Sequence, residues 1–174
     1  EVHEKVIGLR KYVDALQATT DPNELRLEAD LHYMMAFGYF MGKDFPSAAG
    51  QFTSVIEDYP NSLAVSDSVY YRGMARMMQA KYAEAIVDFD AYLDQYPDED
   101  QFSACKFRKA VCLYGINEIV PAEEAFSAFI TDYPEHEFVS EAYSMRGDIE
   151  AAKDGQDNPL TEDVDEYDPN TLDR

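Results

Sequence analysis

The chain has 174 residues, and its 35 acidic and 14 basic side chains give a net charge of −21. Nucleic-acid phosphates and anionic lipid surfaces repel such a chain, which argues against nucleic-acid binding and membrane attachment. No apolar run is long enough for a transmembrane helix, and the length suits one domain with a buried core. Because the first residue is Glu1 and not Met, we expect a processed product or a fragment.

Residues 1–22 are predicted to form a lead-in helix. Their apolar side chains recur mostly at three- and four-residue intervals, which places them on one side of a helix. The sequence Asp21-Pro22-Asn23 is predicted to end this helix, because proline lacks a backbone N–H. The apolar residues are Val6, Leu9, Tyr12, Val13 and Leu16.

Residues 23–153 carry a 37-residue repeat, in which Tyr-Pro closes each unit. A fixed period of this length predicts a solenoid, because one unit cannot bury its apolar side without its neighbours. Three further columns keep the same spacing. They are alanine at Ala48, Ala85 and Ala122, phenylalanine at Phe52, Phe89 and Phe126, and small residues at Ala36, Gly73, Ala110 and Gly147.

Each unit is predicted to be helix, tight turn, helix and stop. Apolar residues have helical spacing in both halves of a unit, the small residue lets the two helices approach, and the proline ends the second helix. Asp98 is expected to cap the start of the following helix. The expected helices span residues 24–42, 46–58, 63–79, 83–95, 100–116, 121–132 and 137–153, so the fourth unit lacks its second helix.

Residues 154–174 change in composition. They are rich in aspartate and glutamate, contain two prolines and show no helical periodicity, so we predict an acidic, disordered tail. Leu160, Val164 and Tyr167 leave open that this tail packs along the solenoid.

The repeat resembles the tetratricopeptide repeat family, whose signature includes Ala, three residues, an aromatic and a Pro eight residues later. Ala48-x3-Phe52…Pro60 and its two later copies match that signature. The long unit closed by Tyr-Pro is similar to bacterial envelope proteins, namely the Tol-Pal accessory protein and the outer-membrane assembly lipoprotein. The resemblance implies an all-α, right-handed superhelix of about three and a half repeats. It also implies a periplasmic or envelope-associated protein, with the cytoplasm as the alternative.

In the resembled family, the first helix of each unit lines a concave groove that binds a partner. The residues in that register form a band of aromatic and apolar side chains, which Met41 and Met78 extend. Such a band on an acidic body suits a basic amphipathic helix or an extended hydrophobic segment. The candidate partner-binding residues are Tyr33, Phe37, Phe40, Tyr70, Met74, Met77, Phe107, Val111 and Tyr114.

A second interpretation treats the same band as packing between helices. It requires that charged residues on the first helices face the groove in place of the aromatic ones. Those charged residues are Arg72, Arg76, Lys106 and Lys109.

No catalytic, cofactor or metal site is expected. The histidines His3, His32 and His136 are far apart in the repeat, and no phosphate-binding or nucleophile motif is present. The acidic tail lacks the order of a calcium loop. Cys105 and Cys112 lie about 10 Å apart on one helix, which predicts free, buried thiols. We therefore expect a protein that is not an enzyme.

Three functions fit these observations. The first is a scaffold or adaptor that binds another protein or peptide. The second is an acidic chaperone that holds a hydrophobic client and should suppress its aggregation. The third is a structural homo-oligomer joined at the incomplete fourth unit, whose mass should depend on concentration. The sequence leaves the oligomeric state and the partner open.

Overall fold

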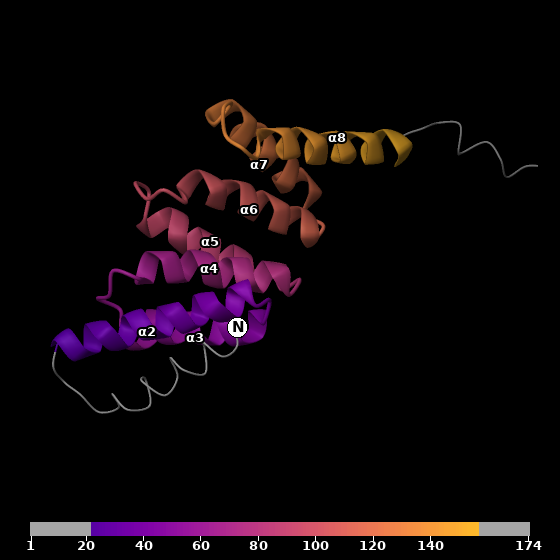
Figure 1. Ribbon diagram of the computed structural model, residues 1–174. Coiled ribbons are helices and arrows are strands. Elements are labelled where there is room, and N and C mark those ends of the chain that lie inside the picture. The colour runs from indigo at the N-terminus through magenta and orange to yellow at the C-terminus, as the bar shows by residue number, and fades with distance from the viewer. Residues whose placement is uncertain (1–21, 157–174) are drawn as a thin grey trace, which may run out of the picture.

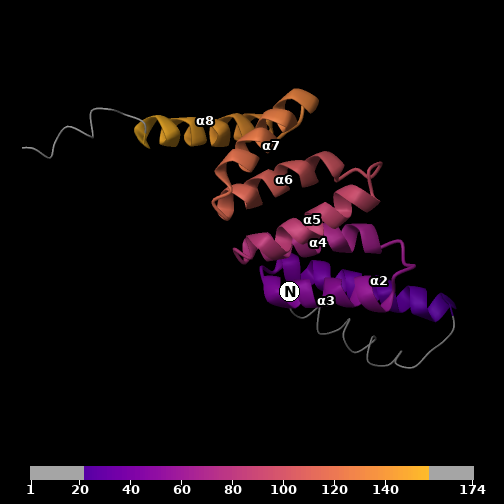
Figure 2. The same cartoon turned by 180° about the vertical axis from the view of Figure 1, so that it is seen from behind.

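The structure, a computed structural model, describes residues 22–156, and every regular element within that range is an α-helix. The helices stack in chain order, with α2 and α8 at opposite ends (Figures 1 and 2). The fold is the all-α superhelix of helical hairpins that the repeat predicts. The helices are α2 (Pro22–Met41), α3 (Phe45–Asp58), α4 (Val65–Met78), α5 (Tyr82–Gln95), α6 (Phe102–Gly115), α7 (Ile119–Asp132) and α8 (Val139–Gln156).

We call α2, α4, α6 and α8 the A helices, and α3, α5 and α7 the B helices. Each A helix packs on the B helix that follows it, and each B helix packs on the next A helix. Across units, α2 also contacts α4, and α4 contacts α6, more extensively than the B helices contact one another. The row of A helices is therefore the inner row of the stack.

The repeated alanines and phenylalanines form the centre of each hairpin. Ala48, Phe52, Ala85 and Phe89 are fully buried, as are their counterparts in the third unit. The column of small residues allows the two helices of a hairpin to approach closely. At Gly73, for example, an added Cβ would lie 2.8 Å from the Phe89 ring. The aromatic of the B helix occupies the space that the missing side chain leaves.

The turn inside each unit has the same geometry three times. Lys43, Ala80 and Asn117 adopt positive φ values of 62°, 57° and 64°. In the second unit, Ala80 N–H donates to Met77 O, and Lys81 N–H donates to Arg76 O. This is a Schellman end, a position that usually carries glycine. Here it is built without glycine, which sequence reasoning did not predict.

The predicted helix ends agree with the observed ones to within three residues, with two differences in the domain boundaries. Pro22, placed in the lead-in segment, belongs to the first turn of α2, where its missing N–H costs nothing. At the other end α8 continues to Gln156, so the first three residues of the predicted tail are helical. The rest of the lead-in helix and of the tail lies outside the described residues.

The predicted cap at Asp98 is wrong. The N-cap of α6 is Gln101, which makes no capping hydrogen bond through its side chain. Asp98 lies in the turn that precedes it. By contrast, Asp44 caps α3, because its carboxylate accepts a hydrogen bond from Ser47 N–H at 3.2 Å.

Candidate partner-binding surface

The first part of the surface is an aromatic joint between the first two units. Phe37 and Phe40 meet the Tyr71 ring edge-on, with ring centroids 5.3 and 5.6 Å apart. Tyr33 donates a long hydrogen bond to Asp67 Oδ2 at 3.4 Å. All three candidates on α2 are only half-buried. They hold α2 against α4 and still present part of each side chain at the surface.

Asp67 gives this joint a negative group. Burial raises the pKa of Tyr33 well above its usual value, and the nearby Asp67 carboxylate raises it further. The Tyr33 hydroxyl is thus protonated to a higher pH than an ordinary phenol and can donate a hydrogen bond throughout that range. A partner segment that lies along α2 would meet aromatic faces beside an acidic group.

Two of the nine candidate residues do not belong to an accessible surface. Tyr70 is 5% exposed and Phe107 is fully buried. Tyr70 packs on Tyr92, and Phe107 stacks on Phe138 with ring centroids 4.9 Å apart. Both face the B helix and the following unit, so a partner cannot reach them in this conformation. The expectation that they are surface anchors is therefore corrected.

The other candidates lie at the edge of the core or outside it. Met74, Met77 and Val111 are half-buried and pack against the two central hydrophobic clusters. Tyr114 is 38% exposed, and the residues that extend the band, Met41 and Met78, are 62% and 54% exposed. Within the predicted band, the most accessible side chains thus lie near the C-terminal ends of the A helices.

Sequence reasoning missed several exposed apolar residues on the A helices, and the most exposed of them is Met34, at 54%. It lies one repeat before Tyr71, which the aromatic band also did not include. A search of the neighbouring repeat column for apolar residues would have found both.

The charged residues of the second interpretation do not replace the aromatic band. Asp88 on α5 is 1% exposed and binds two arginines of α4. Its Oδ1 accepts from Arg72 at 2.8 and 3.1 Å, and its Oδ2 accepts from Arg76 at 2.7 Å. Lys109 pairs with Asp90, and Lys106 pairs with Asp132. All four cations are therefore paired with carboxylates on B helices, and they do not displace the band from the inner row.

The buried ion cluster occurs in the second unit alone among the described repeats. The residues at the Asp88 position are Gln51 in the first unit and Ala125 in the third. Arg72 also donates to Thr53 Oγ1 at 3.2 Å, which ties α4 to the preceding B helix. The cluster satisfies the buried carboxylate of α5 with two arginines of α4, and it serves the structure of the hairpin.

In the part of the chain that the structure describes, the histidines and cysteines contribute to packing within the fold. His32 Nδ1 lies 2.8 Å from Gln51 Oε1, and His136 packs between aromatic rings at the boundary before α8. Cys105 and Cys112 are free and fully buried, as predicted. Burial raises the pKa of Cys112 to about 12. Residues 22–156 contain no cluster of three or more metal-ligating side chains.

A hollow of about 550 Å³ lies between the start of α2 and the loop from α3 to α4. Leu63 at its rim is 85% exposed. Its walls mix apolar and charged groups. The lining residues are Leu25, Arg26, Asp30, Asp58, Tyr59, Pro60, Asn61, Ser62 and Leu63.

The stacked hairpins, the buried alanine and phenylalanine columns and the inner row of A helices define a tetratricopeptide repeat solenoid. A family model described as tetratricopeptide repeat matches residues 30–62. A second model, described as YfiO, outer membrane lipoprotein, matches residues 66–171, which is more than half of the chain. The chain belongs to this YfiO outer membrane lipoprotein family.

A solved structure shows the same fold. It is the "TPR2B-domain:pHsp70-complex of yeast Sti1", which aligns with a TM-score of 0.60 and 19% sequence identity. The alignment covers 72% of this chain and 98% of that one. No curated protein matches the sequence. None of the helices between residues 22 and 156 has both the length and the hydrophobicity that a bilayer crossing requires.

Proposed function

We propose that this protein is a non-catalytic scaffold that binds a segment of another protein along the row of A helices. One observation carries the proposal: exposed apolar side chains recur near the C-terminal ends of two successive A helices, at Met78 on α4 and Tyr114 on α6. A surface that repeats once per unit suits an elongated segment, because each unit can contact a further turn or strand of it.

The net charge of the chain limits the kinds of partner segment that it can bind. A net charge of −21 attracts basic segments and repels acidic ones, and it acts mainly on the rate of encounter. Methionine side chains adapt to differently shaped apolar groups. The partner segment is therefore basic and amphipathic, with apolar residues that contact Met78 and Tyr114. Family membership supports a site of action at the bacterial envelope, in the periplasm.

The test compares two double variants of the full chain in a crosslinking pull-down from cells that make the protein. Met78→Asp/Tyr114→Asp places carboxylates on the proposed surface. Val87→Asp/Val120→Asp alters two residues that are at least as exposed, at 65% and 57%, but lie on B helices. Both variants must keep the helical circular dichroism and melting temperature of the wild type.

Loss of a captured partner in the first variant alone supports the proposal. Equal retention, or equal loss, in both variants contradicts it. Purified partner segments should then bind less tightly as salt is raised, because the attraction between exposed charges is screened.

A homo-oligomer is the second candidate, and the open side of α8 favours it. Tyr143 on α8 is 51% exposed, and a Cβ built on Gly147 would meet no atom within 4 Å. If a second copy covers this side, the mass in solution rises with protein concentration, and Tyr143→Asp keeps the protein monomeric. A concentration-independent monomer contradicts this candidate.

A further inference from the structure

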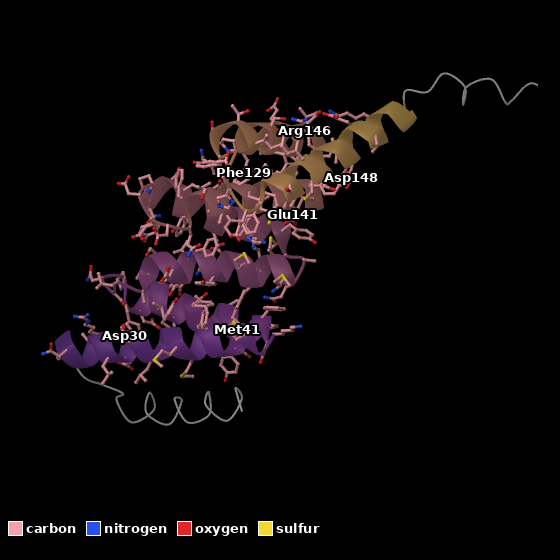
Figure 3. The ribbon with its side chains drawn as sticks, turned by 45° about the horizontal axis from the view of Figure 1, so that its top comes forward. Asp30, Met41, Phe129, Glu141, Arg146 and Asp148 are labelled. Atoms are coloured by element: carbon pink, nitrogen blue, oxygen red, sulfur yellow. The ribbon has the colours of Figure 1, made fainter. Side chains whose placement is uncertain are left out.

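α2 carries an apolar stripe that no described residue covers. Leu27 and Met34 are 50% and 54% exposed, and Met41 continues the same stripe at a seven-residue interval. Leu31 and Gly38, which lie between them on the same side of the helix, are half-buried. The stripe from Leu27 to Met41 follows most of α2 (Pro22–Met41), and Figure 3 labels Met41 near one end of this helix.

The later units show what normally lies on this side of an A helix. One repeat after Leu31 and Gly38 stand Ser68 and Ala75, and two repeats after them stand Cys105 and Cys112. All four of these later residues have 0% exposure. The preceding B helix contributes to that burial, because Cys105 Sγ lies 3.5 Å from Phe89 O of α5.

Met34 leads to the same conclusion. Its counterpart Tyr71 packs on Phe37, Phe40 and Phe52, which all belong to the preceding unit. At Met34 the same position is more than half exposed. The place that a preceding B helix would occupy against α2 is therefore not filled by any residue between 22 and 156.

We propose that residues 1–20 of the same chain occupy this place as a helix packed antiparallel to α2. The length fits: 20 residues in a helix span about 30 Å, which equals the length of the 20-residue α2. The connection at Asp21 is short, and short connections join antiparallel neighbours.

The sequence of the segment matches the stripe in register. Val2, Leu9 and Leu16 recur at seven-residue intervals, as Leu27, Met34 and Met41 do. An antiparallel hairpin that turns at Asp21 places Leu16 opposite Leu27, Leu9 opposite Met34 and Val2 opposite Met41. The segment contains Lys5, Arg10 and Lys11 against Glu1, Glu4 and Asp14, so it is neutral and the rest of the chain carries the whole −21. It is thus the part of this chain that the acidic solenoid repels least.

Cysteine crosslinking in the full chain tests the register. In Leu9→Cys/Met34→Cys, the two Cα atoms should lie within the roughly 7 Å that a disulfide requires. In the control, Lys11→Cys/Met34→Cys, the first cysteine lies on the opposite side of its helix and cannot reach the second. Cys105 and Cys112 are buried in both variants, and peptide mapping by mass spectrometry identifies the bonded pair. We expect the Leu9/Met34 disulfide to form within one chain at least about tenfold faster than the control.

Equal rates in the two variants overturn the proposal, and so does a disulfide that joins two chains, since a second copy would then cover the stripe. A stability measurement guards against perturbation by the cysteines themselves. Leu9→Ser should lower the melting temperature, whereas Ile7→Ser, which removes an aliphatic side chain on the opposite side of the predicted helix, should change it little. Equal effects of the two serine variants also contradict the proposed packing.

Discussion

Gly73 and Gly147 occupy the same position in the repeat, two units apart, and their environments are opposite. A Cβ on Gly73 would lie 2.8 Å from the Phe89 ring, whereas a Cβ on Gly147 would meet nothing within 4 Å. The difference is the B helix: α5 follows α4, whereas no described helix follows α8. The effect of a substitution at one repeat position on stability therefore depends on whether a B helix packs against that position.

The largest effect is expected from removing the buried carboxylate of Asp88, which the second unit has and the third unit lacks. Asp88→Ala copies the third unit at this position but leaves Arg72 with only the neutral Thr53 hydroxyl and Arg76 with only the exposed Glu84 carboxylate. Breaking a buried ion pair costs about 3–5 kcal/mol. Urea unfolding should show this loss.

The matched control for this prediction is Glu84→Ala, which removes the other carboxylate near Arg76. Glu84 is 54% exposed and lies 3.5 Å from Arg76 Nε, so its loss should cost less than about 1 kcal/mol. Similar unfolding midpoints for the two variants would show that the burial of Asp88 has no energetic weight.

The glycine comparison gives the next largest effect, with opposite signs at the two positions. Gly73→Ala forces Phe89 to move in a packed core, at about 1–3 kcal/mol, which exceeds the roughly 1 kcal/mol that alanine gains in a helix. Gly147→Ala has no such clash and should stabilise α8 by up to about 1 kcal/mol. Thermal unfolding of both variants measures the contrast, and a destabilised Gly147→Ala would mean that something covers α8.

Alkaline pH should weaken the interior units before the open end. Burial raises the pKa of Cys112 to about 12, and burial also raises the pKa of Tyr70. A thiol whose pKa rises on folding contributes no pH dependence below its unfolded value of about 9, and stability then falls as the unfolded chain releases its proton. Unfolding free energies should be flat from pH 7 to about 9 and decline from there toward pH 12.

Cys112→Ala provides the check on this assignment, because it should reduce the slope of the decline. An identical slope in that variant would assign the alkaline loss to the other buried groups, Cys105 and the tyrosines.

The smallest expected effect concerns the turn between the helices of the second unit. Ala80 has a positive φ of 57°, a conformation that costs about 1 kcal/mol or more for residues with a Cβ. Ala80→Gly should therefore stabilise the protein by about 0.5–1 kcal/mol, after the greater entropy of glycine in the unfolded chain is counted. A chemical denaturation curve measures it.

Ala128→Gly is the control, since Ala128 is an exposed residue inside α7. There the same substitution should destabilise by about 1 kcal/mol. If both variants shift the midpoint in the same direction, the left-handed turn is not the cause.

The sequence alone determined the repeat, the helices and much of the core. The alanine and phenylalanine columns are buried as expected, because residues at fixed helical spacing in every unit must face the same neighbours. The C-terminal ends of the B helices follow from the Tyr-Pro stops, which act through the covalent geometry of proline and need no tertiary contact.

Only the tertiary structure decided which apolar residues remain accessible. Tyr70 and Met78 lie on the same helix, yet one is buried and the other is half exposed, because Tyr92 of α5 packs on Tyr70. Nor does composition predict that Asp88 is buried, because its burial depends on two arginines from another helix. Spacing along one helix defines its faces, but the helices packed against each face determine which of them a partner can reach.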